Sequence, residues 1–557
     1  MSNTVHGSGG DLLVQVLREA GVDTVYGIIS VHNLPLVEAV DRELRFVPVR
    51  HEATAVNAAD GYARATGRPG CALTSTGTGA GNAAGSLVEC LSAGTSVLHV
   101  TGNIESRYLG SGRGFIHETK DQIGMLKAVS RSAYTITSAE EAAPVLRKAL
   151  IETVDGVGGP VSVEWPIDLQ YRECPDGGDA VDVGLGRTGL AEVSEVDVDR
   201  MMEILSQARR PLIWAGGGST RPGFDTSLLA SLIESWGAGL LTSNSGRGVV
   251  SEANELCVGN YGNNPGGRAL LKSSDLLLTL GTHFRSNETG DYTMPVPRTH
   301  IQIDLDPEAL GRVYPATLGV RSDVDSVLRA LLARVDELST DPDWPRQVAE
   351  TRAEVRKSQR AALGDHTALP DAIAAVLDPT SPIPRDVTIA SSFWGNRLLP
   401  IHDPATNIFP RGGGIGQGLG MALGAADGRP DVPTLCIAGD GGLAVHFGEL
   451  QTLAQEQPWL VLLLFNDRGY GVLRNLQDAG GGRRQGVDLT TPNYRLVAES
   501  HQIPYMCIGS AGMAESVLRE AVSRRGPVIV EVDLDVYGPM AKPFTPPVTV
   551  PSTKKVN

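Results

Sequence analysis

The chain has 557 residues, 41% of them hydrophobic, and a formal net charge of −16. This length suits about three domains of ordinary size, and the acidic balance argues against a nucleic-acid partner or an anionic membrane surface. The six cysteines form no CxxC pair, so neither a zinc site nor a disulfide framework is predicted. The N-terminal sequence lacks a signal-peptide pattern and no apolar run is long enough to span a bilayer, so we expect a cytoplasmic protein.

The chain divides into three blocks, residues 1–170, 190–340 and 365–545, separated by polar stretches. In each block short apolar runs alternate with helix-like patterns, which is typical of parallel sheets covered by helices. The sequence therefore predicts an α/β protein with three doubly wound parallel-sheet domains. The first and third blocks both finish in a GPV strand followed by an acid, which suggests that these two domains are similar. Strand candidates of the later blocks are PLIWA, DLLLTLG, HIQIDLD, DVTIASS, TLCIAGD, LVLLLFND and GPVIVEVDLD.

The first block contains an acid in the segment VRHEATAVNAADGYARATGRPG, residues 49–70. Glu52 has two interpretations. It is either a functional carboxyl group or a surface acid that pairs with Arg50 or Arg64 on one helix face.

Two acids of the third block each follow a buried-strand candidate, Asp440 after TLCIAG and Asp467 after LVLLLFN. Ligands of parallel α/β sheets bind beyond the carboxyl ends of the strands, so neighbouring strands would bring both carboxylates together. Carboxylate oxygens suit Mg²⁺, which binds protein carboxylates together with phosphate oxygens and water. Glycines near both acids let backbone N–H groups approach a phosphate closely. The alternative is a pair of strand-end turns with solvated acids.

A glycine-rich segment of the same block, GIGQGLG at 414–420, matches the GxGxxG pattern. A dinucleotide site there would need a preceding strand and an acid about twenty residues further on. NIFPR is a poor strand and Pro430–Asp431 lies in a predicted turn, so the sequence argues against dinucleotide binding at this segment.

GDG at 439–441, an interval of 24 residues and the pair Asn466–Asp467 resemble the thiamin-diphosphate motif of the family of acetolactate synthase, benzoylformate decarboxylase and pyruvate oxidase. Residues 49–70 are similar to the N-terminal signature of the same family, and the resemblance covers nearly the whole chain. It implies a pyrimidine-binding domain, a central domain and a diphosphate-binding domain, in that order. It also implies thiamin diphosphate and Mg²⁺ as cofactors and 2-oxo acids as substrates.

The resemblance implies roles for individual residues. Glu52 would share a proton with the aminopyrimidine ring, which activates the cofactor as a carbon nucleophile. Asp440, Asp467 and the backbone carbonyl of Gly469 would hold Mg²⁺, although the family usually has Asn where Asp467 stands. The remaining cofactor contacts would be the supporting side chain of Ile415, the carbonyl of Gly413, and Gly441, Gly442, Tyr470, Gly471 and Val472 along the diphosphate.

Substrate contacts are expected from loops that depart from the family pattern. The loop of Ser30, Val31 and His32 replaces a Pro-Gly segment, and the alternative for His32 is a surface loop histidine. Ser75 stands where decarboxylases of aryl 2-oxo acids carry a histidine. His117 and Glu118 align with the Gln-Glu pair of acetolactate synthases, where a histidine can transfer a proton; the alternative for His117 is packing within its loop. Apolar walls are expected from Leu473 and Leu476.

These features favour a decarboxylating carboligase similar to acetolactate synthase. It would form a carbon–carbon bond through an enamine, with an aldehyde or a second 2-oxo acid as acceptor. One alternative is a decarboxylase that does not couple, similar to benzoylformate decarboxylase. Another is a catalytically silent paralogue that acts as a binding subunit, against which the intact Glu52, Asp440 and Asp467 argue.

Two further expectations follow from the resemblance. Glu52 and Asp440 belong to different domains, and the family builds each site from two chains, so a homodimer or homotetramer is implied. The middle block is similar to the domain that holds FAD in some relatives. FAD is therefore a candidate cofactor, but His283 stands where the flavin-binding synthases have arginine, which argues against it.

Overall fold

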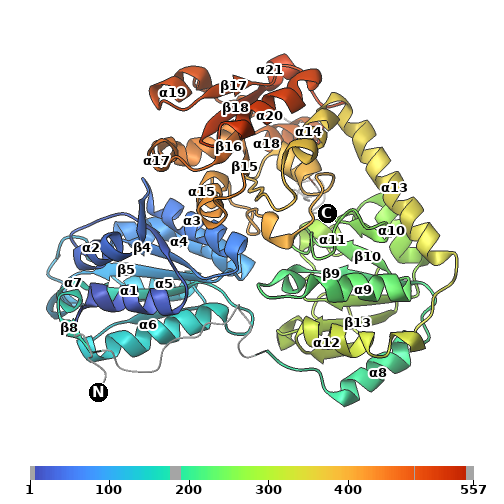
Figure 1. Cartoon of the computed structure of the whole chain (residues 1–557), viewed down its shortest axis with the longest axis horizontal. Helices are drawn as coiled ribbons and strands as arrows, with labels where there is room; N and C mark the ends of the chain where they lie inside the picture. Colours follow the sequence, from blue (N-terminus) through green and yellow to red (C-terminus); the bar gives the residue numbers. More distant parts are fainter. Residues whose placement is uncertain (1–6, 176–189, 482, 547–557) are drawn as a thin grey trace.

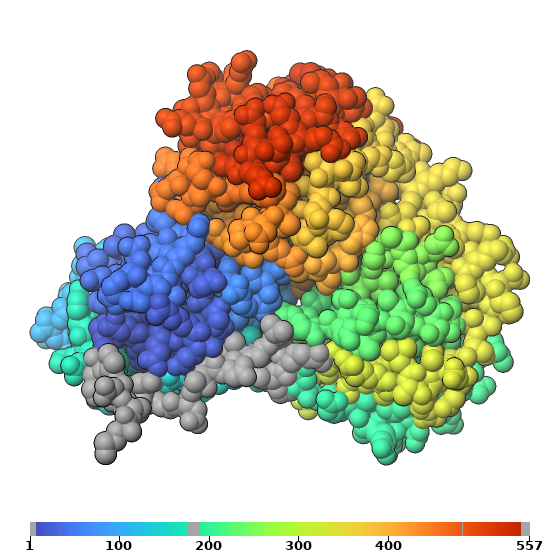
Figure 2. Space-filling model, in the orientation of Figure 1, coloured from blue at the N-terminus to red at the C-terminus, as the bar shows by residue number. Residues whose placement is uncertain are grey.

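The computed structural model describes residues 7–175, 190–481 and 483–546. Figure 1 shows lobes that follow one another along the sequence, the first in blue, the second in green and the third in orange and red. Each of these lobes is built around a parallel sheet with helices on its faces. Figure 2 shows the lobes packed against one another around the centre of the molecule. The predicted α/β class with doubly wound parallel sheets is confirmed.

The sheet of the first lobe has the order β3-β2-β4-β5-β7-β6, and its neighbouring strands run parallel. Its central strands are buried along their whole length because helices cover both faces. The elements are β1 (Gly7–Ser8), α1 (Gly9–Glu19), β2 (Thr24–Gly27), α2 (Leu34–Glu43), β3 (Arg45–Pro48), α3 (Glu52–Thr66), β4 (Gly70–Thr74), α4 (Thr78–Ala93), β5 (Val97–Asn103), α5 (Gln122–Val129), β6 (Ser132–Thr135), α6 (Ala139–Val154), β7 (Val161–Pro166), α7 (Ile167–Gln170) and β8 (Glu173–Cys174).

The sheet of the central lobe has the order β11-β10-β9-β12-β13-β14. Successive strands are added outward on one side of β9 and on the opposite side of β12. The order therefore changes direction between β9 and β12, and open α/β sheets bind ligands at such a switch point. The elements are α8 (Glu195–Leu205), β9 (Pro211–Ala215), α9 (Thr226–Trp236), β10 (Gly239–Thr242), β11 (Cys257–Gly259), α10 (Pro265–Ser273), β12 (Leu276–Leu280), α11 (Ser286–Thr289), β13 (Thr299–Asp304), β14 (Leu318–Arg321) and α12 (Val324–Leu332). The long helix α13 (Trp344–Leu363) then leads to the third lobe (Figure 1).

The sheet of the third lobe has the order β15-β16-β18-β17, which repeats the order β4-β5-β7-β6 of the first lobe. In both sheets the last long strand lies between the two that precede it, and a one-turn helix follows it. The repeated GPV strands, β7 and β18, occupy equivalent places. The elements are α14 (Ala368–Val376), α15 (Gly418–Gly428), β15 (Thr434–Gly439), α16 (Asp440–Leu443), α17 (Leu450–Glu456), β16 (Leu460–Asn466), α18 (Gly471–Ala479), α19 (Tyr494–Ser500), β17 (Tyr505–Cys507), α20 (Ala514–Ser523), β18 (Val528–Asp533) and α21 (Leu534–Tyr537).

The prediction of a strand at DVTIASS, residues 386–392, is wrong. Only Arg385 makes an isolated parallel bridge to Ile437, and Ser391–Gly395 form a turn of π-helix. The chain leaves the sheet here because the side chain of Asp386 accepts hydrogen bonds from the backbone N–H groups of a neighbouring loop.

Helix α3 of the first lobe crosses α15 of the third lobe at very short range. Gly61 lies against the backbone of Met421, and Gly424 lies against the backbone of Ala58. A Cβ atom at either glycine would overlap the opposing backbone, so the two helices approach this closely only without side chains there. This crossing places the start of α3 next to the third lobe.

Candidate active site

Two carboxylates meet at one edge of the third sheet. Strands β15 and β16 are parallel neighbours, with Gly439 opposite Phe465, so Asp440 and Asp467 follow at the same edge. The Asp440 carboxylate accepts hydrogen bonds from the backbone N–H groups of Gly469 at 2.8 Å and Asp467 at 3.4 Å. Asp440 is only 2% exposed, so the alternative of two solvated turn acids is wrong.

The two carboxyl groups destabilise each other's charge. Burial raises the pKa of Asp440, and burial together with the Asp440 charge raises the pKa of Asp467. The positive charge of Arg474 offsets the repulsion between the two carboxylates only in part. Its Nη1 lies 3.9 Å from Asp467 Oδ2, and its Nε donates a hydrogen bond to Asp488 at 2.8 Å. A divalent cation between the two carboxylates would relieve this repulsion, so the donor set fits Mg²⁺.

A further ligand for such a cation would come from the backbone. Among the described residues, no group of three or more His, Cys, Asp or Glu side chains is arranged to hold a metal ion. The carbonyl oxygen of Gly469 faces the Asp440 turn, since a Cβ atom on Gly441 would lie 3.0 Å from it. Asp440, Asp467 and this carbonyl therefore surround one space.

The glycines around the pair are required by close packing. A Cβ atom at Gly441 would lie 2.8 Å from the Tyr470 ring, and one at Gly471 would overlap the Asp467 carboxylate. A Cβ atom at Gly442 would lie 3.0 Å from the carboxylate of Asp386. The backbone at this edge therefore carries no side chains at these positions, which lets its N–H groups approach a diphosphate closely.

Asp386 holds the loop that contains Gly413 and Ile415, and sequence reasoning missed it. Its buried carboxylate accepts hydrogen bonds from the N–H groups of Gly416 at 3.0 Å and Gly418 at 3.2 Å. Gly413 and Gly416 have φ of 85° and 84°, and the Ile415 side chain is 40% exposed. Burial raises the pKa of Asp386 to about 6. No local pattern distinguishes this acid, because its partners lie about thirty residues along the chain.

Glu52 begins α3 and is half-buried. Its Oε2 accepts a hydrogen bond from Asn82 Nδ2 at 3.0 Å, and a Cβ atom on Gly79 would lie 2.9 Å from its Oε1. Its expected arginine partners bind elsewhere: Arg50 donates to Pro48 and Gln455, and Arg64 donates to Asp60, Glu89, Thr95 and Phe409. The alternative of a surface ion pair on the helix face is therefore wrong.

The start of α3 contacts the segment that follows Asp440 within one chain. The ring centroids of His51 and His446 are 5.0 Å apart. The backbone N–H of Arg50 donates to the Glu449 carboxylate at 3.0 Å. Burial and the neighbouring His51 lower the pKa of His446 to about 4.

The structure brings two predicted substrate residues of the first lobe together. His32 Nε2 lies 3.0 Å from His117 Nδ1. His32 is only 4% exposed, so the alternative of a surface loop histidine is wrong, whereas His117 is exposed. Sequence reasoning missed Asn33, whose side chain shapes the loop by bonding the N–H of Ser30 and the carbonyl of Ile28.

The other predicted substrate residues lie on two different lobes. In the first lobe, Ser75 packs against Gly79 beside Glu52, Val31 is 61% exposed, and Glu118 accepts a hydrogen bond from the N–H of Phe115. In the third lobe, Leu473 is exposed and Leu476 half-buried, both on α18, which also carries Val472. Within the described chain, no hydrogen bond joins loops 28–33 and 115–118 to the third lobe.

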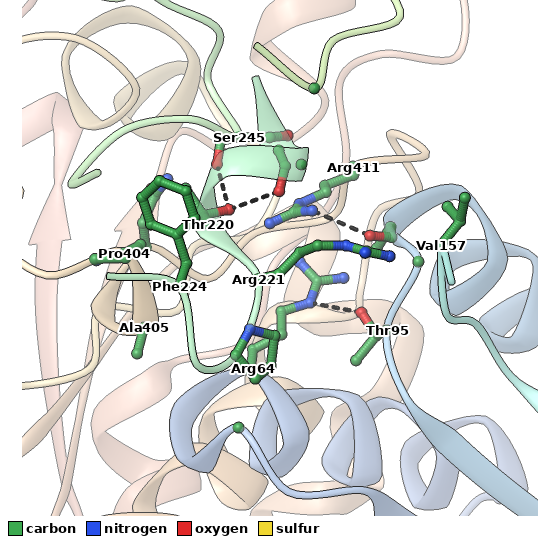
Figure 3. Close-up of a pocket in the computed structure, with 18 of the residues that line it drawn as sticks. Arg64, Thr95, Val157, Thr220, Arg221, Phe224, Ser245, Pro404, Ala405 and Arg411 are labelled. Carbon is green, nitrogen blue, oxygen red and sulfur yellow. Dashed lines mark hydrogen bonds between the residues drawn. The ribbon is translucent and has the colours of Figure 1, made fainter. Parts of the chain in front are cut away.

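A separate cavity of about 800 Å³ lies between the lobes, at the switch point of the central sheet. It is lined by Gly217 and Gly218 after β9 and by Gly281 after β12. Figure 3 shows the side chains of Arg64, Arg221 and Arg411, from all three lobes, directed toward the same space.

The lining of this cavity holds more arginines than carboxylates: Arg64, Arg68, Arg221, Arg285, Arg411 and Arg429 against Glu288, Asp304, Asp323 and Asp403. Arg221 Nη1 and Arg411 Nε are buried and have no hydrogen-bond partner among the described residues. Burial and the nearby Arg64 and Arg285 lower the pKa of Arg411 to about 9. His283 is exposed at the rim, with its Nε2 3.8 Å from Asp306 Oδ2. Such a lining fits an anionic ligand, since an anion would satisfy the buried guanidinium groups.

No helix in the described part of the chain has both the length and the apolar character needed to cross a membrane.

Comparison with known proteins gave matches along most of the chain. Three family models match: the thiamine pyrophosphate enzyme N-terminal TPP binding domain at residues 7–125, central domain at 198–331 and C-terminal TPP binding domain at 390–532. The chain is 30% identical to a probable 2-ketoarginine decarboxylase of Pseudomonas aeruginosa, over 94% of each protein. It is 26% identical to a probable acetolactate synthase large subunit of Methanococcus aeolicus, over 95% of this chain and 92% of that protein. It is 25% identical to the acetolactate synthase isozyme 1 large subunit of Escherichia coli, over 97% and 96%.

Proposed function

The chain belongs to the thiamine pyrophosphate enzyme family and acts on 2-oxo acids, and on that premise we propose that it is a Mg²⁺-dependent 2-oxo acid decarboxylase. One observation carries the proposal beyond the family. A hydrogen-bonded histidine pair, His32 and His117, lies on the same lobe as Glu52 and is suited to supply a proton to the product.

The cofactor site would be assembled from the residues described above. Asp440, Asp467 and the Gly469 carbonyl would hold Mg²⁺, and Glu52 would exchange a proton with the pyrimidine ring. When bound, thiamin diphosphate supplies the carbon nucleophile and the electron sink for loss of carbon dioxide. The loop held by Asp386 would present Gly413 and Ile415 to the cofactor, and its diphosphate would lie along Gly441, Gly442, Tyr470, Gly471 and Val472.

The proton balance distinguishes the two product outcomes. Release of an aldehyde places a proton on the carbon that lost carbon dioxide, whereas carboligation joins that carbon to an acceptor aldehyde or 2-oxo acid. The His32–His117 pair and the relative named 2-ketoarginine decarboxylase support aldehyde release. Carboligation, the outcome expected from the sequence, is the second candidate; Ser75 beside Glu52 and the relatives named acetolactate synthase favour it.

The complete donor set also argues against a silent paralogue. Asp440 and Asp467 are buried together at an energetic cost that serves no purpose unless a cation binds between them.

We further propose a homodimer or homotetramer with sites between chains. Asn82, which bonds Glu52, lies on the outer face of α4. This face also carries Gly81, Gly85 and the 46% exposed Val88, and a Cβ atom on either glycine would meet no atom within 4 Å. A second copy could therefore approach this face and cover Glu52. Sedimentation of the wild type and of Gly85→Leu tests this: the variant should shift toward monomer.

The arginine-lined cavity would hold an anionic nucleotide. Its volume lies within the ordinary range of cofactor pockets. His283 stands where the flavin-binding synthases have arginine, and its exposed side chain adds no buried positive charge to the cavity. This supports the expectation that FAD is absent. The visible absorbance of the purified protein measures its flavin content directly.

Product analysis tests the central proposal. The protein would be supplied with thiamin diphosphate, Mg²⁺ and a panel of pyruvate, 2-ketoarginine and benzoylformate, with and without added aldehyde. We expect carbon dioxide and free aldehyde from at least one acid, and release at least about a hundredfold slower from Glu52→Gln. Hydroxy ketone as the main product would favour the second candidate, and bound cofactor without turnover of any acid would overturn the proposal.

A further inference from the structure

A second group of arginines lies at the contact between the central and third lobes. Helix α13 runs from the central lobe to the third lobe and packs against α10 and the edge strand β11 (Figure 1). Arg352 and Arg356 lie one turn apart on α13, and both approach Glu252, which is 2% exposed. Neither arginine lines the cavity that contains Arg221, so this contact is a separate place in the molecule.

The carboxylate of Glu252 is already paired with a third arginine. Arg247 donates from Nε and Nη2 to its two oxygens at 2.7 and 2.8 Å, and the backbone N–H of Ile401 donates to Oε2 at 3.2 Å. Arg356 Nη2 lies 3.7 Å from Oε2 without a hydrogen bond, and Arg352 donates to the backbone carbonyl of Glu252 at 2.8 Å. Glu252 therefore neutralises one guanidinium group, and the charges of the other two remain uncompensated.

Two more arginines add positive charge to the same contact. Arg385 is fully buried and donates only to neutral groups, among them the side-chain oxygens of Asn396 and Asn407. Burial lowers the pKa of Arg385 to about 9, and the charge of Arg247 contributes to this. Burial and the charge of Arg247 also lower the pKa of Arg397. Buried positive charge of this kind destabilises the fold unless a negative charge lies beside it.

Several hydrogen-bond donors at this contact have no acceptor. Arg356 Nε and Nη2, Arg352 Nε and the hydroxyl group of Tyr261 are buried without a hydrogen-bond partner among the described residues. Tyr261 is only 1% exposed, and its ring lies with the Glu252 carboxylate against Gly259. Burial raises the pKa of Tyr261, and the nearby charge of Arg356 offsets part of this effect. Buried donors without a partner are rare in folded proteins, so this group of donors indicates an acceptor that lies outside the protein chain.

The chemistry of the contact selects an anion as this acceptor. The donor atoms are inaccessible to solvent, so a side chain of a second protein molecule cannot reach them without opening the contact. A water molecule accepts hydrogen bonds but carries no charge, and it would leave the arginines uncompensated. A small anion supplies the acceptor and the negative charge together, and its hydrogen bonds to guanidinium groups are of the strong, charge-assisted kind.

We propose that a small inorganic anion, chloride or phosphate, binds beside α13 where the central lobe contacts segment 395–401, and that Arg352, Arg356 and Tyr261 hold it. Arg247 already binds backbone carbonyls of this segment. The anion therefore adds a second link between the central and third lobes at the same place. This inference does not depend on the proposed function.

Thermal unfolding of the full chain tests the proposal. The protein is dialysed into sodium gluconate with EDTA, and sodium chloride or sodium phosphate then replaces the gluconate at constant ionic strength. We expect at least one of the two anions to raise the melting temperature by about 2–4 °C at saturation. A shift with chloride alone identifies a monatomic ion, a shift with phosphate alone identifies an oxyanion, and equal shifts identify a site that accepts both.

Substitutions distinguish an anion site from simple packing. Tyr261→Phe removes only a hydroxyl group that has no partner, so in gluconate it should leave the melting temperature unchanged or slightly higher. With the anion present, Tyr261→Phe should lose about half of the shift and Arg356→Gln most of it. Arg360→Gln is the matched control, because this arginine lies one turn further along α13 and pairs with Asp371 at the surface. It should keep the full shift.

The results that overturn the proposal are specific. The first is a melting temperature that neither anion changes, and the second is a shift that Tyr261→Phe and Arg356→Gln both keep. Arg221→Gln removes a buried guanidinium group from the separate cavity and should keep the shift; complete loss of the shift in this variant would place the anion in that cavity instead. A Tyr261→Phe variant that is clearly less stable than the wild type in gluconate would show that the hydroxyl group already has a partner, which removes it from the site.

Discussion

The buried pair of carboxylates makes a quantitative prediction about the metal-free protein. Burial and the Asp440 charge raise the pKa of Asp467 from 3.8 to about 7. Each pKa unit corresponds to about 1.4 kcal/mol, so ionising Asp467 in the folded chain costs about 4 kcal/mol above pH 7. Asp467→Asn removes this charge with little change of shape. It should therefore raise the free energy of unfolding by up to about 4 kcal/mol at pH 8 in EDTA.

The pH dependence of this gain has a definite sign. Below about pH 4 the carboxyl is neutral in both the folded and the unfolded chain, so the variant gains nothing there. Between about pH 4 and pH 7 the unfolded carboxyl ionises first, and the wild type loses stability as the pH rises. When Mg²⁺ and thiamin diphosphate are both saturating, the wild type should be more stable than Asp467→Asn, because the wild type then has two carboxylates to bind the cation.

Urea unfolding followed by tryptophan fluorescence at pH 5 and pH 8 measures the effect. Asp488→Asn is the matched control, since it removes the same charge from a 58% exposed carboxylate that also pairs with Arg474. It should be neutral or slightly destabilising at both pH values. An equal gain for Asp467→Asn at both pH values, or an equal gain in the control, would refute the electrostatic explanation.

Three more predictions follow from the site, the lobe contact and the cavity. Glu52→Gln should lower kcat about a hundredfold to ten-thousandfold while cofactor binding, measured by calorimetry, persists. Gly424→Ala should destabilise the protein by about 1–3 kcal/mol in urea unfolding, because its Cβ would overlap the backbone of Ala58. ADP, but not adenosine, should raise the melting temperature of the wild type, and Arg221→Gln should abolish this shift because the buried guanidinium group is lost.

Each of these predictions has a result that contradicts it. Full turnover in Glu52→Gln would remove that carboxyl from the mechanism. Gly512→Ala, where an added Cβ meets no atom within 4 Å, should be neutral, and a loss equal to that of Gly424→Ala would exclude a packing cause. An equal shift with adenosine would mean that the cavity does not select for phosphate.

The carboxylate pair could be predicted from the sequence because its signal is local. Asp440 and Asp467 each follow an uninterrupted apolar strand, and parallel strands end at a common edge, so the strand pattern alone brings the two acids together. The failed strand at 386–392 shows the limit of this reasoning. Its composition resembles a strand, but Asp386 bonds the loop at 416–418 and draws the chain out of the sheet.

The remaining site residues were not predictable because their partners are distant. Asn82 becomes relevant to Glu52 only when α4 packs beside α3, and the spacing of the two residues carries no pattern. His32 and His117 were each recognised as candidates, but their hydrogen bond depends on two loops that only the folded sheet brings together. Arg474, which lies between Asp467 and Asp488, was missed for the same reason.

The crossing of α3 and α15 also has a consequence for motion. Because Gly61 and Gly424 bring the two helix backbones into direct contact, neither helix can slide along the other without a collision of main-chain atoms. The first and third lobes of one chain should therefore behave as a single rigid body during turnover. Any gate for substrate entry must then open elsewhere, by local rearrangement of the exposed loops around Val31 and His117.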